Sequence, residues 1–175
     1  MTDRDLRRRC QRVVAGLDIA SPLDVHALCR QVASRRGRPI QLVPMDAGPG
    51  LSGLWLATPT TDYIAYEAST SPLHRDHIIL HELGHLLCDH AAAELVAGDY
   101  GHLLPSVDAG VVRSVLGRAT HADDQEREAE LIAALIHQRA RRGAQTAGRD
   151  AVDVAPAVHR LETVLQGHVD WTSDH

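Results

Sequence analysis

In this 175-residue chain, one short histidine motif constrains the possible fold and chemistry more than any other segment does. His81 and His85 bracket the pentapeptide HELGH, which lies inside the otherwise apolar run IILHELGHLLC. Apolar residues at this spacing predict a largely buried helix. Two histidines four positions apart lie about 40° apart around such a helix, with Cβ atoms roughly 5 to 6 Å from each other. Both imidazoles can therefore reach one tetrahedral metal ion.

Glu82 stands in the position of a general base beside this pair. It lies about 100° round the helix from His81, which disfavours it as a ligand of the same ion but lets it lean over a bound water. The chain's own frequencies of His and Glu predict about 0.03 accidental HExxH patterns, so chance is a poor explanation. The alternative is a pair of core histidines whose nitrogens bond to backbone or carboxylate partners.

A third ligand must come from elsewhere in the chain, because catalytic zinc usually keeps three protein ligands and an open position for water. The metzincin extension would place glycine and histidine at fixed positions after His85, where Cys88 and Ala91 stand instead. A distant carboxylate, as in the His2Glu sets of several metalloproteases, is the alternative.

The acidic helix predicted over 123–142 supplies the best candidates for this carboxylate. Glu126 and Glu130 are four residues apart and share one face with small residues such as Ala129, which would let this helix pack closely on the HELGH helix. Buried carboxylates flanked by alanine are costly unless they meet cations or a metal. We therefore expect Glu126 to be the third ligand, and Glu130 to accept a hydrogen bond from the N–H of a ligand imidazole, that of His81.

Other interpretations of the same residues stay open. Glu126 and Glu128 could belong to a solvated first turn that the helix dipole favours. His74 and His77 could extend a polar stripe or relay protons, or bond to a neighbouring carboxylate. Four further histidines could serve as ligands or as oxyanion-stabilising groups: His90, His102, His121 and His137.

The remaining segments predict an α+β domain, mainly helical, with a small antiparallel or mixed sheet beside the HELGH helix. Ser21 and Ser71, each followed by proline, are the expected N-caps, and Gly37 and Gly143 the expected helix ends. The expected helices span 3–16, 23–36, 72–97, 106–117, 123–142 and 156–166, and the expected strands 40–43, 52–58 and 62–67, the last two as a hairpin with Trp55 in the core. We expect 143–155 to be a polar linker and 167–175 a mobile tail.

Net charge and cysteine content exclude several classes of protein. The formal net charge is -5 and no basic stripe follows any predicted element, which argues against direct nucleic-acid binding. Three cysteines without a CxxC spacing indicate neither a disulfide framework nor a thiolate zinc site, and so a reducing compartment. No apolar run is long enough for a signal peptide or a membrane span. We therefore expect a cytoplasmic protein.

Two separated motifs resemble those of a known family. The hairpin, the segment TSPLHRDHIILHELGHLLCDH and, forty residues after its HELGH motif, EREAELIAAL resemble in order and spacing the ImmA/IrrE family of zinc-dependent metallopeptidase-like regulators. In that family an HExxH helix is followed by a helix of the form ExxA(N/D)xFAAxLL, and the match covers roughly residues 38–140. The resemblance implies a zincin-like fold for these residues. We expect a single domain over 1–142, with the N-terminal helices 1–37 packed on it, followed by the linker, short helix and tail of 143–175.

The chain departs from the family pattern at several positions of the second motif. Glu130 stands where the family usually has Asn or Asp, and Ile132 stands where it has Phe. The LLMP ending is replaced by Leu135, Ile136 and His137. Glu130 is longer than the usual residue, which bears on the hydrogen bond expected of it, whereas Ile132 should change only packing.

The resemblance implies a cytoplasmic zinc endopeptidase that cleaves a helix-turn-helix transcriptional repressor. Carried over by position, His81 and His85 would be zinc ligands, Glu126 the third ligand and Glu82 the general base. The hairpin could hold an extended substrate segment by strand addition. The alternative is a regulatory or toxin-like protein that binds its partner without cutting it and whose zinc site is structural or vestigial.

Overall fold

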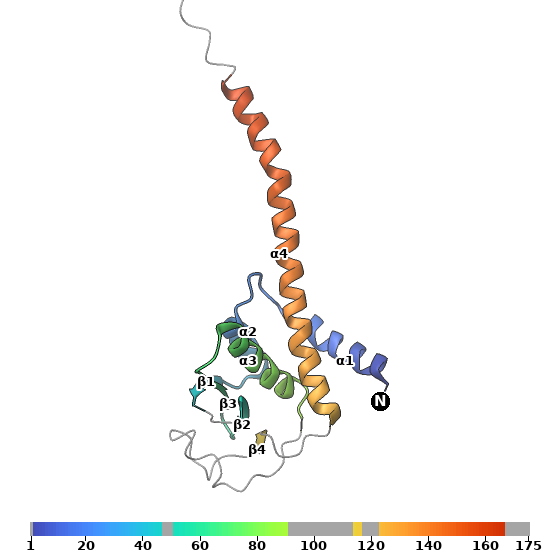
Figure 1. Ribbon diagram of the computed structural model, residues 1–175, viewed down its shortest axis with the longest axis vertical. Coiled ribbons are helices and arrows are strands. Elements are labelled where there is room, and N and C mark those ends of the chain that lie inside the picture. The colour runs from blue at the N-terminus through green and yellow to red at the C-terminus, as the bar shows by residue number, and fades with distance from the viewer. Residues whose placement is uncertain (1, 47–50, 91–113, 117–122, 167–175) are drawn as a thin grey trace, which may run out of the picture.

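The computed structural model describes residues 2–46, 51–90, 114–116 and 123–166, with the backbone alone for 114–116 and 147–166 (Figure 1). The described residues form four helices and four strands in an α+β arrangement. In order they are α1 (Asp3–Ala15), α2 (Val25–Arg36), β1 (Ile40–Met45), β2 (Gly53–Ala57), β3 (Asp62–Glu67), α3 (Pro72–Leu87), β4 (Ser114–Leu116) and α4 (Asp123–Gln166).

The four strands form one mixed sheet in the order β1-β3-β2-β4. β2 and β3 pair antiparallel as the predicted hairpin, β1 pairs parallel with β3, and β4 pairs antiparallel with β2. Trp55 of β2 is buried in the core as expected, and its indole N–H donates to Asp62 Oδ1 at 3.2 Å. The hairpin expected to hold a substrate segment by strand addition thus already has a neighbour on each side, β1 beside β3 and β4 beside Trp55–Ala57 of β2.

Helix α3 lies between the sheet and the first part of α4 (Figure 1). One side of it packs on β2 and β3 and another on α4, while α1 covers α4 and α2 contacts α3 and β1. Because the chain has no Phe, branched aliphatic side chains fill the space between these layers. The largest fully buried apolar side chains are Leu54, Ile64, Ile79, Leu80, Leu83, Leu86, Ile132 and Ile136.

The predicted helix starts are right for α3 and wrong for α2. Ser71 caps α3, with its side chain accepting from the backbone N–H of His74. The cap of α2 is Asp24 rather than Ser21, because the Asp24 carboxylate accepts the N–H of Ala27 at 2.8 Å and the helix begins only after it. The predicted end of α2 is confirmed: the glycine at position 37 adopts the left-handed conformation, with φ 64°.

The HELGH helix ends sooner than its apolar pattern predicted. After Leu87 the chain turns at Asp89, which adopts a left-handed conformation with φ 48°. The N–H of His90 then donates to the carbonyl of His85 at 3.1 Å, and the N–H of Asp89 to that of Leu86 at 3.3 Å. These two bonds form a Schellman motif with aspartate in the place of the usual glycine. The helix predicted through 97 is therefore wrong at 88–90, and 91–97 lies outside the described residues.

Helix α4 is longer than predicted and runs on without a break. The expected end at Gly143 and the expected linker over 143–155 are both wrong, since helix continues to Gln166. A Cβ on Gly143 would lie 3.0 Å from that of Ser21, so this glycine permits close packing with the loop before α2 rather than ending a helix. The short helix expected over 106–117 is wrong at 114–116, which is strand β4. Residues 106–113 and the expected tail 167–175 lie outside the described part.

The three cysteines are free, as their spacing predicted. Burial is the main cause that raises the pKa of Cys10 to about 11 and those of Cys29 and Cys88 to about 12. All three thiols are therefore protonated near neutral pH and poor nucleophiles. Among the described residues, none of the helices combines the length and apolar character needed to cross a membrane.

Candidate metal centre

The two histidines of the HELGH motif face the same point from successive turns of α3. Their Nε2 atoms lie 3.1 Å apart, and the rings of His81 and His85 meet edge to face with centroids 4.8 Å apart. His85 is buried, and the side chain of His81 is 22% exposed. The pair is therefore accessible from one side, at His81.

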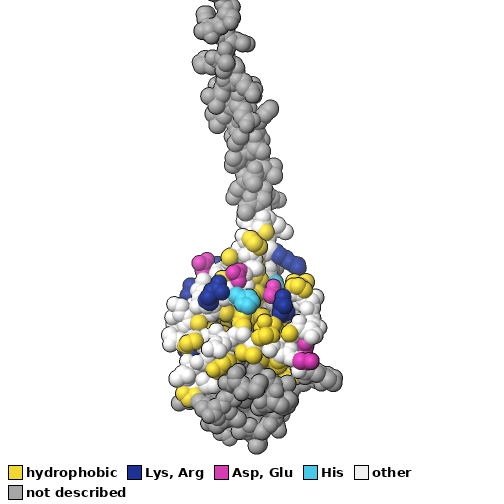
Figure 2. Space-filling model, turned by 90° about the vertical axis from the view of Figure 1, so that its left-hand side faces the viewer, with side chains coloured by type: hydrophobic (Ala, Val, Ile, Leu, Met, Phe, Trp, Pro, Cys, Tyr) yellow, Lys and Arg dark blue, Asp and Glu magenta, His cyan; other side chains and the backbone are white. Residues whose placement is uncertain are grey.

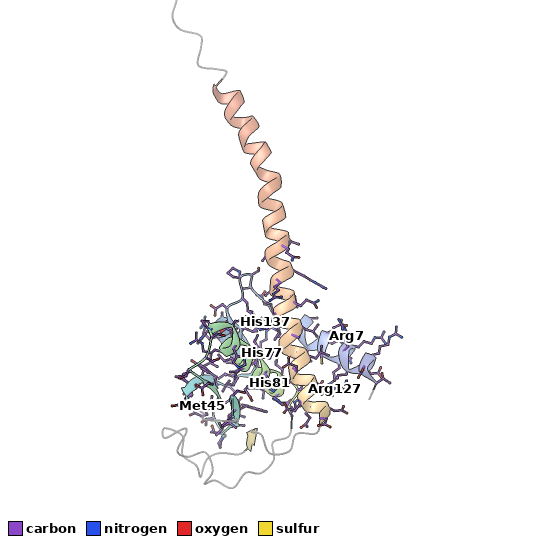
Figure 3. The ribbon with its side chains drawn as sticks, in the orientation of Figure 1. Arg7, Met45, His77, His81, Arg127 and His137 are labelled. Atoms are coloured by element: carbon purple, nitrogen blue, oxygen red, sulfur yellow. The ribbon has the colours of Figure 1, made fainter. Side chains whose placement is uncertain are left out.

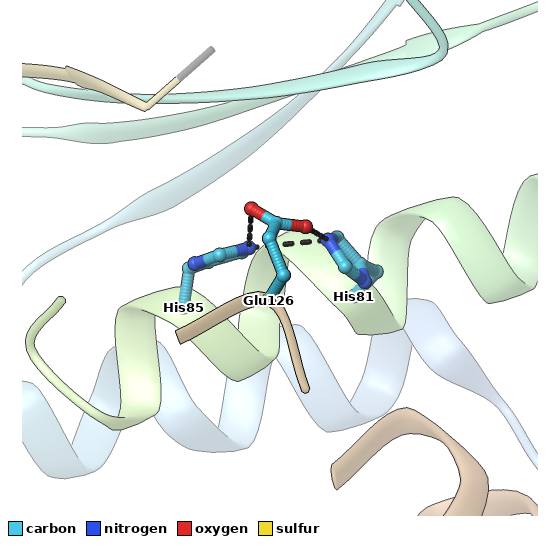
Figure 4. A group of neighbouring side chains, drawn as sticks. All are labelled: His81, His85 and Glu126. Atoms are coloured by element: carbon cyan, nitrogen blue, oxygen red, sulfur yellow. Dashed lines mark hydrogen bonds and ion pairs between the residues drawn. The ribbon is translucent and has the colours of Figure 1, made fainter. Parts of the chain in front are cut away.

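Glu126 completes the group from the first turn of α4 (Figure 4). One carboxylate oxygen lies 3.3 Å from His81 Nε2 and the other 3.5 Å from His85 Nε2. Two atoms that bind one tetrahedral zinc ion at about 2.0 to 2.1 Å lie about 3.3 Å from each other. The shortest separations between the three side chains are 3.1 to 3.5 Å, with the two Glu126 distances measured to different oxygens. With one ligand atom from each residue, the three atoms lie within 4.8 Å of one another, close enough to converge on one ion. Two imidazole nitrogens and one carboxylate are also a zinc-type donor set.

A close approach of two helices brings Glu126 to the histidines. Gly84 of α3 packs on Ala129 of α4, and a Cβ at position 84 would lie 3.0 Å from both the Cα and the carbonyl oxygen of Ala129. Ala129 and Ala133 are fully buried, in agreement with the expectation that small residues allow tight packing here. Glu126 lies three residues before this contact, within one helical turn of it.

Glu82 is held in a buried position against strand β2. Its carboxylate accepts the backbone N–H of Trp55, and Gly53 leaves it room: a Cβ on Gly53 would lie 2.6 Å from Glu82 Oε1. The pKa of Glu82 is raised from 4.5 to about 8, first by burial and then by the charge of Glu126, while the Trp55 N–H acts in the opposite direction. A carboxyl group with a pKa near neutrality can both accept and release a proton under physiological conditions.

Glu130 lies on the outer side of the same centre and contacts two histidines. Its Oε2 is 3.5 Å from His81 Nδ1, the nitrogen that the expected hydrogen bond would use, and 3.1 Å from His77 Nε2. His77 in turn stacks on His137 of α4, with ring centroids 6.0 Å apart and planes 9° apart. The longer side chain of Glu130 thus reaches both rings instead of serving His81 alone.

The sequence named His90 only as one of four candidate ligands and gave no sign of the second, largely buried group that it forms behind His85. Cys88, His90 and Glu128 bring their ligand-type atoms within 4.8 Å of one another. Glu128 is 3% exposed and does not belong to a solvated first turn, because α1 packs over it and Arg9 pairs with it. No periodicity could have revealed this group, which forms only because α3 ends at 87 and turns His90 back.

Glu126 is partly solvated, with 45% of its side chain exposed, and it also turns toward the histidines. The expectation that Glu126 and Glu130 are buried is wrong, since the side chain of Glu130 is 56% exposed.

An open groove adjoins the centre between the start of α3 and the middle of α4. Its volume is about 760 Å³, and its lining includes His74, His77, His137, Arg141, Arg142 and the exposed Leu73. Figure 3 shows His137, His77 and His81 following one another along α4 and α3. Burial is the largest cause that lowers the pKa of His137, so its imidazole favours the neutral form. Figure 2 shows a face of the molecule on which histidines lie among arginine, acidic and hydrophobic side chains.

Comparison with family models, with curated proteins and with solved structures finds no match for this chain. The resemblance to the ImmA/IrrE family therefore remains a prediction carried by two motifs. Two other histidines named as candidates, His102 and His121, lie outside the described residues. What the site can do chemically follows from the geometry of its own side chains.

Proposed function

We propose that this chain is a zinc-dependent endopeptidase with a zincin-like fold that cleaves a specific cytoplasmic protein. The observation that carries the proposal is the convergence of His81, His85 and Glu126 from two helices, with ligand atoms within 4.8 Å of one another. A structural site would have no use for a buried carboxyl group beside such a centre, and Glu82 is one. The mixed sheet packed on the HELGH helix is compatible with the zincin-like arrangement.

Within this proposal the side chains have separate tasks. When bound, zinc supplies a Lewis acid for the scissile carbonyl and a water whose pKa is near 7. Glu82, in its ionised form, would accept a proton from the attacking water at its carboxylate and would later return it to the leaving amine. The Trp55 N–H fixes the orientation of this carboxylate. Glu130 orients the imidazole of His81 through Nδ1.

The proposed substrate is a helix-turn-helix transcriptional repressor. Its cleaved segment has to be extended and exposed, because the centre is reached from the side on which His81 is accessible. The groove lined by His77, Arg141 and Arg142 suits a substrate segment that carries acidic side chains several residues away from the cleaved bond, because Arg141 lies roughly 22 Å along α4 from Glu126.

The test uses the full chain, loaded with zinc and incubated with a panel of helix-turn-helix repressors from the same genome. We expect one equivalent of zinc by metal analysis and repressor fragments by mass spectrometry. Glu82→Gln should keep the zinc and abolish cleavage, whereas His81→Ala and Glu126→Ala should lose the metal. Cleavage by Glu82→Gln, or failure of the wild-type chain to bind zinc, would overturn the proposal. An intact, zinc-loaded complex without fragments would instead establish the non-proteolytic alternative.

A further inference from the structure

A buried row of polar side chains runs from His85 away from Glu126. The Nδ1 atom of His85 lies 2.9 Å from Nδ1 of His90, and Nε2 of His90 lies 3.0 Å from Oε2 of Glu128. The other oxygen of Glu128 pairs with Nε of Arg9 at 2.9 Å. The side chains of His90 and Glu128 are each 4% exposed, so this row is almost completely shielded from water.

The chemistry of these atoms fixes where the hydrogens are when both histidines are neutral. An ionised carboxylate only accepts hydrogen bonds, so Glu128 requires the hydrogen of His90 on Nε2. The Nδ1 of His90 then has a lone pair and must accept, which places the hydrogen of His85 on Nδ1. His85 is left with an unprotonated Nε2, the nitrogen that faces Glu126 and His81. One tautomer of His85 is thus selected, the one that can bind a metal ion through Nε2.

Arg9 supplies a counter-charge to Glu128. A buried carboxylate without a counter-charge would be costly. The guanidinium of Arg9, which comes from α1, supplies that counter-charge directly. Its presence also argues against a second metal ion at Cys88, His90 and Glu128, since a permanent positive charge already occupies one oxygen of Glu128.

We propose that His90 and Glu128, backed by Arg9, are positioning residues that hold His85 in its metal-binding tautomer and orientation. The inference rests on the proposed function in that it takes His85 as a metal ligand. Partners behind a ligand histidine commonly change metal affinity by about 10- to 100-fold. Here the partner of His85 is a second histidine, His90. Its own hydrogen position is set by Glu128, which pairs with Arg9 of α1.

Two substitutions of His90 separate this role from simple packing. Leucine fills much of the space but can neither donate nor accept, so His90→Leu should weaken zinc binding about 10- to 100-fold. Glutamine can accept from His85 through its oxygen and donate to Glu128 through its nitrogen, so His90→Gln should bind zinc within a few-fold of the wild type. Zinc affinity is measured on the full chain by competition with a chromogenic chelator.

A second measurement needs no bound metal. Nitrogen-15 NMR of the zinc-free wild-type chain should show His85 protonated on Nδ1, and in His90→Leu a mixture of tautomers. Unchanged zinc affinity in His90→Leu, or a wild-type His85 protonated on Nε2, would overturn the inference, as would a second equivalent of zinc that His90→Leu loses. If the wild-type chain binds no zinc at all, the proposed function fails, while the NMR result still decides the tautomer on its own.

Discussion

Gly84 and Ala129 meet where α3 crosses α4, at a separation that leaves no room for a methyl group between them. A Cβ on Gly84 would lie 3.0 Å from the Cα and from the carbonyl oxygen of Ala129. These are backbone atoms of a buried helix, which cannot rotate away as a long side chain can. The separation of the helices, and with it the distance from Glu126 to both histidines, depends on this glycine.

Gly84→Ala should therefore lower both stability and metal affinity. Within a helix, alanine normally stabilises by about 0.5 to 1 kcal/mol relative to glycine. Overpacking against Ala129 should reverse this sign and lower the free energy of unfolding by about 1 to 3 kcal/mol. Denaturant titration gives the first quantity and chelator competition the second. Gly16→Ala is the control: its Cβ would meet nothing closer than 3.4 Å, so unfolding and zinc binding should stay close to wild type.

Gly53→Ala should damage hydrolysis far more than metal binding. The added Cβ would lie 2.6 Å from Glu82 Oε1 and from Ile78 Cγ2, so the carboxylate has to move away from its place beside Trp55. Displacing a reacting group by about 1 Å can cost about 100-fold in rate. We expect kcat to fall by about that factor while zinc stoichiometry stays at one equivalent. Full activity in this variant would contradict the position assigned to Glu82.

The zinc-free chain should lose stability as pH rises, because of Glu82. Its pKa is raised from 4.5 to about 8 on folding, so between these values the folded chain holds a proton that the unfolded chain has released. This contribution is complete below pH 4.5 and is lost toward pH 8, by at most about 5 kcal/mol at about 1.4 kcal/mol per pKa unit. Glu82→Gln lacks this loss. Denaturant titrations with chelator should therefore show the difference in unfolding free energy, variant minus wild type, increasing with pH; parallel profiles would disprove the shift.

Zinc should stabilise the folded chain, and Glu126 should be required for most of the effect. A ligand present at 100 times its Kd adds about 2.7 kcal/mol to the free energy of unfolding. For a chain of this size that corresponds to a rise in Tm of roughly 5 to 10 °C. Glu126→Gln should abolish most of this rise. Asp124→Asn, which changes an exposed carboxylate in the same first turn, should preserve it. Thermal melts with zinc and with chelator make the comparison.

The sequence predicted the candidate site best where all the residues concerned lie on one helix. The spacing of His81, Glu82 and His85 fixes their directions on α3 without reference to any other element. Glu126 was harder, because its position depends on how two helices pack, but the small residue at 129 indicated a close approach. The hairpin followed equally from local alternation and a turn-rich connection.

The predictions that were wrong concern residues whose role depends on contacts between segments far apart in the sequence. Asp89 ends α3 in a conformation usually taken by glycine, so no familiar residue marked the turn that brings His90 back. Gly143 looked like a helix end but serves packing against Ser21. Glu128 looked solvated because Arg9, its partner, lies more than a hundred residues earlier in the chain. Such pairings are settled by the tertiary arrangement of the helices and leave no local pattern.

Because Arg9 of α1 pairs with Glu128, the shortest fragment of this chain that can bind the metal normally has to include α1. A truncated form beginning after α1 would retain the whole HELGH motif and Glu126, and a motif search would judge it intact. It would nevertheless leave the buried carboxylate of Glu128 without its counter-charge. Glu128 contacts His90, which contacts His85. Helix α1 thus supports the metal centre, and a chain shortened at its N-terminus by removal of α1 should bind the metal more weakly.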